Sequence, residues 1–152
     1  MAHEHNYSLF SPKTDTFKLI SNHMDAWQVA LIVACLPLLI HDAIWWETAV
    51  LALAIGVGYW FAFALNDFYD APFDKLDEQK KGRNFFIKRS VSEPQFLSLA
   101  MLLLFVLAVA YAQFGWRGWL FWGVSCFIAW AYSAPPVRLK NRPGLDLLTH
   151  AL

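Results

Sequence analysis

Four stretches of the chain are almost purely apolar, and polar residues gather between them. The strongest run, residues 48–65, contains no charged residue, and neither do the runs at 96–113 and 118–135. Each approaches the length of about 20 residues that a helix needs to cross the hydrocarbon layer. An earlier run, residues 26–40, is shorter and contains Pro37, which a membrane helix tolerates as a kink. The pattern predicts an all-α, polytopic membrane bundle with four transmembrane helices.

The segments around these runs complete the expected organisation. Residues 1–25 form a cytoplasmic amino-terminal segment, within which the mixed pattern of 14–24 predicts an interfacial helix. Residues 26–152 form the amino-terminal part of a single helical bundle, and residues 74–93 form its one long polar loop. A new apolar segment starts at residue 145, so we expect the start of a fifth transmembrane helix there.

Composition supports a membrane protein and excludes some partners. The chain is 58% hydrophobic and only 16% charged, against about 25% charged residues in a soluble domain. A net charge of zero excludes a nucleic-acid binder, which carries a basic excess. Cys35 and Cys126 each lie in an apolar run far from any second cysteine, so neither a disulfide framework nor a zinc site is expected.

The basic residues predict the orientation of the bundle. With a cytoplasmic amino terminus and four spans, the outer side carries only Arg117 of the 12 basic residues. Such a bias is what the positive-inside rule requires of a multi-pass protein. We therefore expect an integral protein of the cell membrane with its amino terminus in the cytoplasm. The remaining basic residues then share that side: Lys13, Lys18, Lys75, Lys80, Lys81, Arg83, Lys88, Arg89, Arg138, Lys140 and Arg142.

An acidic motif follows the strongest apolar run directly. On a continuous helix Asp67, Asp70 and Asp74 occupy positions i, i+3 and i+7 and share one face. Carboxylates gathered in this way repel one another unless a cation lies between them, and Mg²⁺ prefers such oxygen ligands. Pro72 leaves a second possibility, in which the helix ends near Asp70 and a turn brings Asp74 round. Solvated boundary acids are the plainer alternative, but an acid abutting a charge-free span favours a functional site.

Two segments resemble one known family. Residues 66–74, which read Asn-Asp-Phe-Tyr-Asp-Ala-Pro-Phe-Asp, resemble the first aspartate-rich motif of the UbiA-type intramembrane prenyltransferases. Residues 132–144, which read Tyr-Ser-Ala-Pro-Pro-Val-Arg-Leu-Lys-Asn-Arg-Pro-Gly, are similar to the segment after the fourth span in that family. The predicted topology places both segments on the same membrane face, two spans apart. The wording of the second segment is nearest to the lycopene elongase or a related carotenoid or lipid branch.

The resemblance implies a function and a set of site residues. Family members transfer an isoprenyl group from an isoprenyl diphosphate to a lipophilic acceptor within the bilayer, with Mg²⁺ as cofactor. It implies that Asp67, Asp70 and Asp74 bind the metal, and that Asp67, Asp70, Tyr132 and Lys140 act in catalysis. It further implies that the diphosphate is bound by Asn66, Arg83, Arg138 and Lys140. Residues 82–87 depart from the family, which commonly has an Arg-Pro pair there, so the assignment of Arg83 is the least supported.

Three other functions remain open at this stage. The family has a second aspartate-rich motif in its later spans, so the chain could be a catalytically incomplete fragment or a half-subunit whose partner chain supplies that motif. Another membrane enzyme of diphosphate chemistry, a CDP-alcohol phosphotransferase, would carry an Asp-Gly-x-x-Ala-Arg pattern, which the sequence lacks. A cation transporter would place its acids at mid-membrane between broken helices, whereas these acids lie at the end of a span.

Overall fold

The computed structural model describes residues 24–40, 44–89 and 91–145, and within them every regular element is helical. The all-α prediction is therefore confirmed for this part of the chain. The elements, in order, are α2 (Met24–Ile40), α3 (Trp45–Asp74), α4 (Glu78–Lys81), α5 (Phe85–Lys88), α6 (Glu93–Ala112), α7 (Gly115–Ser133) and the 3₁₀ helix η1 (Leu139–Asn141).

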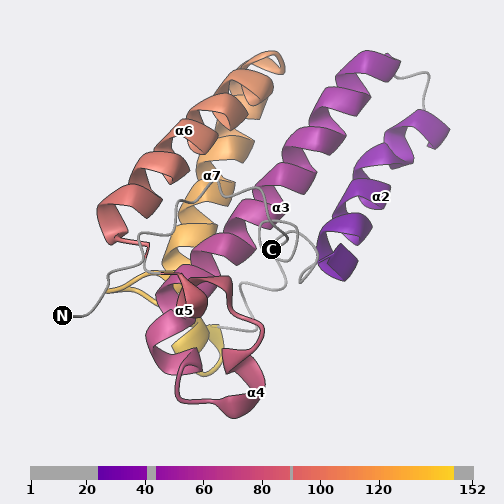
Figure 1. Cartoon of the computed structure of the whole chain (residues 1–152). Helices are drawn as coiled ribbons and strands as arrows, with labels where there is room; N and C mark the ends of the chain where they lie inside the picture. The colour runs from indigo at the N-terminus through magenta and orange to yellow at the C-terminus, as the bar shows by residue number, and fades with distance from the viewer. Residues whose placement is uncertain (1–23, 41–43, 90, 146–152) are drawn as a thin grey trace.

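The four long helices lie side by side, with α3 between α2 and the hairpin of α6 and α7 (Figure 1). Helix α3 packs against α2 on one side and against both α6 and α7 on the other. The short helix α5 also packs on α3, near its carboxyl end. Since α3 contacts all of its long neighbours, it is the element from which the site is built.

Glycines bring neighbouring segments close together at two points. A methyl group at Gly56 of α3 would lie 2.9 Å from Leu31 Cδ2 of α2, so the two helices approach each other closely there. A methyl group at Gly118 would lie 2.0 Å from the carbonyl oxygen of Tyr111, where α7 folds back on α6. Small residues at helix contacts permit this kind of approach, which is common in membrane bundles.

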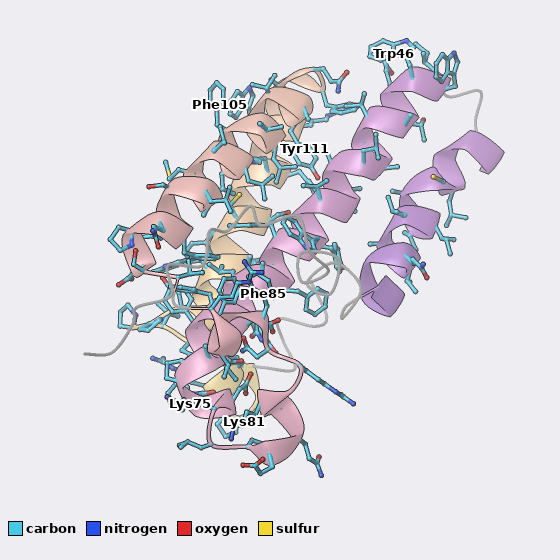
Figure 2. The ribbon with its side chains drawn as sticks, in the orientation of Figure 1. Trp46, Lys75, Lys81, Phe85, Phe105 and Tyr111 are labelled. Carbon is cyan, nitrogen blue, oxygen red and sulfur yellow. The ribbon has the colours of Figure 1, made fainter. Side chains whose placement is uncertain are left out.

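In the part of the chain that the structure describes, two helices, α3 and α6, are long and apolar enough to cross a membrane. Figure 2 shows large side chains projecting outward along the long helices. On α6, for example, Met101, Leu102, Phe105 and Val109 are exposed. A contiguous apolar surface of this kind suits a lipid environment. The other two predicted spans correspond to the helices α2 and α7, and their crossing of the bilayer stays a prediction.

The end of α3 differs from one of the two expectations. The helix continues through Pro72 to Asp74, so the alternative in which it ends near Asp70 is wrong. Proline lacks the amide hydrogen that would bond to the carbonyl of Phe68, but the turn is supported from elsewhere. The amide of Lys75 bonds to Ala71 O at 3.1 Å, and the side chain of Asn84 donates to the neighbouring carbonyl of Asp67 at 2.8 Å.

The segment expected as the loop 74–93 contains two short helices, α4 and α5. An aromatic cluster holds α5 against the bundle: Phe68 and Phe96 stack at 4.1 Å between ring centroids, and Phe86 meets both edge-on. Ser92 and Gln95 form a capping box that starts α6 after this segment. The interfacial helix expected at 14–24 and the fifth span expected at 145–152 lie almost entirely outside the described residues.

Candidate functional site

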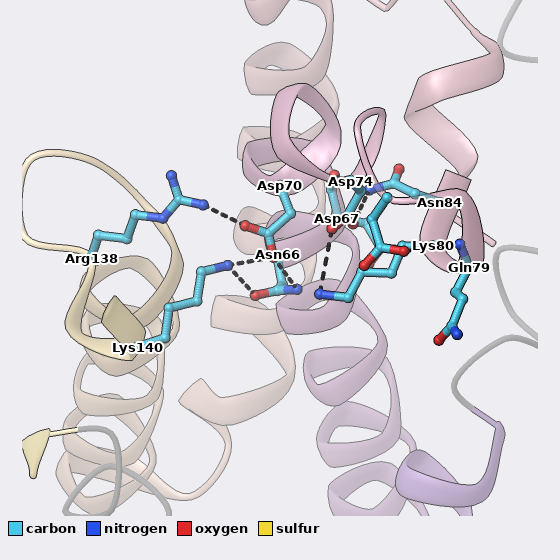
Figure 3. A network of polar contacts seen from close by, with 10 residues as sticks. Asn66, Asp67, Asp70, Asp74, Gln79, Lys80, Asn84, Arg138 and Lys140 are labelled. Atoms are coloured by element: carbon cyan, nitrogen blue, oxygen red, sulfur yellow. Dashed lines mark hydrogen bonds and ion pairs between the residues drawn. The ribbon is translucent and has the colours of Figure 1, made fainter. Parts of the chain in front are cut away.

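The two sequence motifs meet through Asp70. Its carboxylate accepts hydrogen bonds from Arg138 Nη2 at 2.5 Å and from Lys140 Nζ at 2.6 Å (Figure 3). The three side chains are 12–18% exposed, which leaves them largely shielded from solvent. Two cations and one carboxylate leave a net positive charge at this point, which favours an anion nearby.

Asn66, one turn before Asp70, holds the same cluster together. Its side-chain amide donates to Asp70 Oδ2 at 3.0 Å, while its Oδ1 accepts from Lys140 Nζ at 2.7 Å. Ser133, the last residue of α7, donates to the same Oδ1 at 3.4 Å. Asn66 therefore joins the ends of α3, α7 and η1 at one point, because an amide can donate and accept at once.

The turn after α7 and the 3₁₀ helix η1 carry the two cations, Arg138 and Lys140. After Ser133 the chain passes through Pro135 and Pro136, whose peptide bond is cis, to Arg138. Arg138 has a φ of 41° and lies in the left-handed region, which is uncommon for a residue other than glycine. Its guanidinium carbon lies 4.3 Å from the centre of the Phe73 ring, a cation–π contact on the side chain one turn beyond Asp70.

Asp67 and Asp74 are held by a different set of residues. Asp74 Oδ2 accepts from Asn84 Nδ2 at 3.0 Å, and Lys80 Nζ lies 3.8 Å from Asp74 Oδ1. Asp67 is only 7% exposed, and its carbonyl oxygen accepts from the same amide of Asn84. The acidic motif thus has two sides, one toward η1 and one toward the α4–α5 segment (Figure 3).

The structure brings four of the eight predicted site residues into one cluster. Asn66, Asp70, Arg138 and Lys140 are joined by direct hydrogen bonds, although the two motifs lie far apart in the chain. The other four predicted residues lie outside this cluster of contacts. Asp67 and Asp74 lie beside Asn84, Tyr132 is half-buried near the end of α7, and Arg83 is exposed between α4 and α5.

Four residues of the site were missed by sequence analysis: Ser133, Asn84, Lys80 and Phe73. The sequence held one signal for Asn84: an asparagine directly before a short apolar run is typical of a helix N-cap. In the structure Asn84 does cap α5, because its Oδ1 accepts a hydrogen bond from Phe86 N at 2.9 Å. The contact of Asn84 with Asp74 could not be read from the sequence, because it depends on how α5 docks.

The donor types in the acidic motif suit magnesium, which prefers carboxylate and phosphate oxygens. Among the residues that the structure describes, no group of three or more His, Cys, Asp or Glu side chains comes together as a metal site. Magnesium seldom uses an all-protein cage and is usually bound by one or two carboxylates with substrate phosphates and waters. One or two carboxylates of the acidic motif, drawn from Asp67, Asp70 and Asp74, therefore have the chemistry that protein ligands supply in such a site.

The decisive comparison is with protein families. The model of the UbiA prenyltransferase family matches residues 25–151, which is most of the chain and includes both motifs. The chain belongs to the UbiA prenyltransferase family. No curated protein and no solved structure matches it.

Membership confirms the resemblance given by the two motifs. The UbiA family consists of integral membrane proteins with helical folds and prenyltransferase activity, so this UbiA-family chain is a membrane protein of that class.

Proposed function

We propose that the protein transfers an isoprenyl group from an isoprenyl diphosphate to a lipophilic acceptor at the carboxyl end of α3. The observation that carries this proposal is the contact of Asp70 with both Arg138 and Lys140, because it joins the acidic motif to two cations in one shielded place. A diphosphate with its metal requires acidic and basic side chains together.

In this proposal Arg138 and Lys140 bind the diphosphate. Their nitrogens are already aimed at carboxylate oxygens of Asp70, and phosphate oxygens have the same charge and accept the same hydrogen bonds. When the diphosphate takes over these donors, the carboxylate of Asp70 becomes available to a cation. Asn66 keeps Lys140 in place during the exchange, because its Oδ1 accepts from Lys140 independently of Asp70.

Asp67, Asp70 and Asp74 would hold Mg²⁺, which supplies positive charge to the diphosphate as it departs. The side chains of the protein then have three tasks in the reaction. Arg138 and Lys140 stabilise the charge that develops when the carbon–oxygen bond of the allylic diphosphate breaks and the electron pair stays on the diphosphate. Tyr132 helps to position the diphosphate from the end of α7.

The third task is to protect the allylic carbon from water and to stabilise its positive charge. Aromatic faces do both, and Phe68 stacks with Phe96 close to the acidic motif. Phe61, Phe63 and Tyr69 are further aromatic residues of α3 near the motif. An acceptor carbon then forms the new bond and loses a proton. We place the acceptor among carotenoids or related lipids, because residues 132–144 read most like that branch.

The experiment uses membranes that contain the full-length protein, geranylgeranyl diphosphate and a panel of lipophilic acceptors, with and without EDTA. We expect prenylated product that EDTA abolishes and that Asp67→Asn and Asp70→Asn each lower at least a hundredfold. Glu78→Gln is the matched control, since Glu78 lies in the exposed helix α4 and forms an exposed ion pair with Lys81 of the same helix. Unchanged transfer in both aspartate variants would reject the proposal.

A further inference from the structure

Asn84 is buried, although the residues just before it in the chain are exposed. It is 3% exposed, whereas both Gly82 and Arg83 are exposed. Its side chain makes three hydrogen bonds: it donates to Asp67 O and to Asp74 Oδ2, and it accepts from Phe86 N. A buried amide with both ends satisfied holds its partners in a fixed geometry.

The three bonds join two separate structures. The accepting end of Asn84 caps the four-residue helix α5, which the aromatic cluster of Phe68, Phe86 and Phe96 holds against the bundle. The donating end reaches across to the last two turns of α3, where it meets both Asp67 and Asp74. The side chain of Asn84 therefore links the position of α5 to the two aspartates, beside the ring contact of Phe86 with Phe68.

We propose that Asn84 is a positioning residue that orients the carboxylate of Asp74 for binding of the metal–diphosphate. This inference rests on the proposed function, and it assigns a role to a residue outside both sequence motifs. With one Asp74 oxygen held by Asn84, the other is left to face a cation, and Lys80 lies 3.8 Å from it. Groups that orient metal-binding carboxylates commonly change metal affinity ten- to a hundredfold when they are removed.

The Asn84→Asp substitution separates the two ends of the side chain. Aspartate has the same shape and is an equally good N-cap, so it still accepts from Phe86 N. An ionised aspartate cannot donate to Asp67 O or to Asp74 Oδ2. Its carboxylate would also lie next to that of Asp74 and repel it. Asn84→Ser removes the amide nitrogen that makes both donations, without adding charge. Its hydroxyl oxygen can still cap α5, but the side chain is shorter and carries one donor in place of two. The pair of variants therefore distinguishes lost orientation from charge repulsion.

Asp77 provides the matched control. It caps α4 by accepting from Gln79 N at 2.9 Å, as Asn84 caps α5, but its capping side chain is exposed. Asp77→Asn therefore makes the reverse isosteric exchange at the equivalent position of the neighbouring short helix, and asparagine caps as well as aspartate does.

The measurement is titration of the full-length protein in lipid nanodiscs with Mn²⁺, an EPR-visible substitute for Mg²⁺, in the presence of inorganic pyrophosphate. We expect Asn84→Asp and Asn84→Ser to raise the dissociation constant for Mn²⁺ about tenfold or more, with the number of sites per protein unchanged. Asp77→Asn should leave both quantities unchanged. A misfolded fraction would instead reduce the number of sites and leave the dissociation constant as it was.

An unchanged dissociation constant in both Asn84 variants, or a loss of sites alone, would overturn the positioning role. That outcome is distinct from failure of the proposed function. If the function were wrong, the unaltered protein would bind no Mn²⁺ with pyrophosphate, or would bind it equally well after Asp70→Asn. A wild-type protein that binds, an Asp70→Asn variant that does not and an unaffected Asn84→Ser variant would leave the function standing and reject this inference alone.

Discussion

Arg138 Nη2 lies 2.5 Å from Asp70 Oδ1, although the two residues are 68 positions apart in the chain. This contact brings the end of α3 to the turn after α7, and Lys140 reinforces it from η1 at 2.6 Å. The ion cluster of Asp70, Arg138 and Lys140 thus stabilises the packing of α3 against the end of α7, and it is also the proposed diphosphate site. Its members are shielded enough that removing one of them leaves the others uncompensated.

Replacing Asp70 by alanine should destabilise the fold. Arg138 and Lys140 would then lie together without their shared carboxylate, and loss of one partner from a buried ion pair costs about 3 kcal/mol. The free energy of unfolding in detergent, measured with a denaturant series, tests this. A second substitution, Arg138→Met, should recover part of the loss, because it removes one of the two uncompensated cations.

Glu78→Gln serves as the control for the charge itself. Glu78 and Lys81 form an exposed pair at 3.5 Å, and such pairs contribute little to stability. If Asp70→Ala lowered the free energy of unfolding no more than Glu78→Gln does, the ion cluster would not stabilise the fold.

The ring of Phe73 should support the function of Arg138. The guanidinium carbon lies 4.3 Å from the ring centre, and Phe73 is otherwise 58% exposed, so its chief described contact is this one. Phe73→Leu keeps an apolar side chain but removes the aromatic face, which is worth about 0.5–1 kcal/mol at an exposed site. We expect binding of pyrophosphate with Mn²⁺ to weaken about two- to fivefold in a titration calorimeter.

The control for Phe73 is Leu76→Ala, three residues further along, at a side chain that is 85% exposed. It changes an exposed apolar residue in the same region without touching a cation. An equal loss of affinity in both variants would mean that general apolar surface, and not the cation–π contact, supports the site.

Gly118 should tolerate no side chain. A methyl group there would lie 2.0 Å from the backbone oxygen of Tyr111, which cannot move without distorting the end of α6. We expect Gly118→Ala to lower the free energy of unfolding by about 1–3 kcal/mol, the usual cost of overpacking. Gly123→Ala in the same helix meets nothing within 4 Å and should be neutral or stabilising, since alanine favours helix. Equal stability of the two variants would contradict the close α6–α7 contact.

Gly56 should respond to size in a graded way. Its neighbour is the flexible end of Leu31, so Gly56→Ala should cost less than Gly118→Ala, whereas Gly56→Leu should push α2 away from α3. Leu31→Ala in the same chain should restore much of the stability of Gly56→Leu, because it vacates the volume required. Gly58→Leu, at a position with open space, is the control, and thermal unfolding in nanodiscs gives the comparison.

The all-α class of fold and the four residues that meet at the candidate site could be predicted from the sequence. The apolar runs at 48–65 and 96–113 correspond to α3 and α6, because helix formation in a bilayer depends mainly on local length and hydropathy. The family resemblance was confirmed over residues 25–151. The sequence could not decide whether Pro72 ends α3, because the answer depends on support that arrives from Asn84 and the turn at Lys75.

By itself, therefore, the sequence determined the long apolar helices and the motifs at their ends, since those properties depend mainly on residues close together in the chain. It did not show the short helices α4 and α5 within the predicted loop. Only the tertiary structure decided that Asp70 meets Arg138 and Lys140 while Asp74 meets Asn84. The reason is that a side-chain contact depends on the packing angle and rotation of helices far apart in the chain, and on a left-handed backbone at Arg138 that no local preference favours.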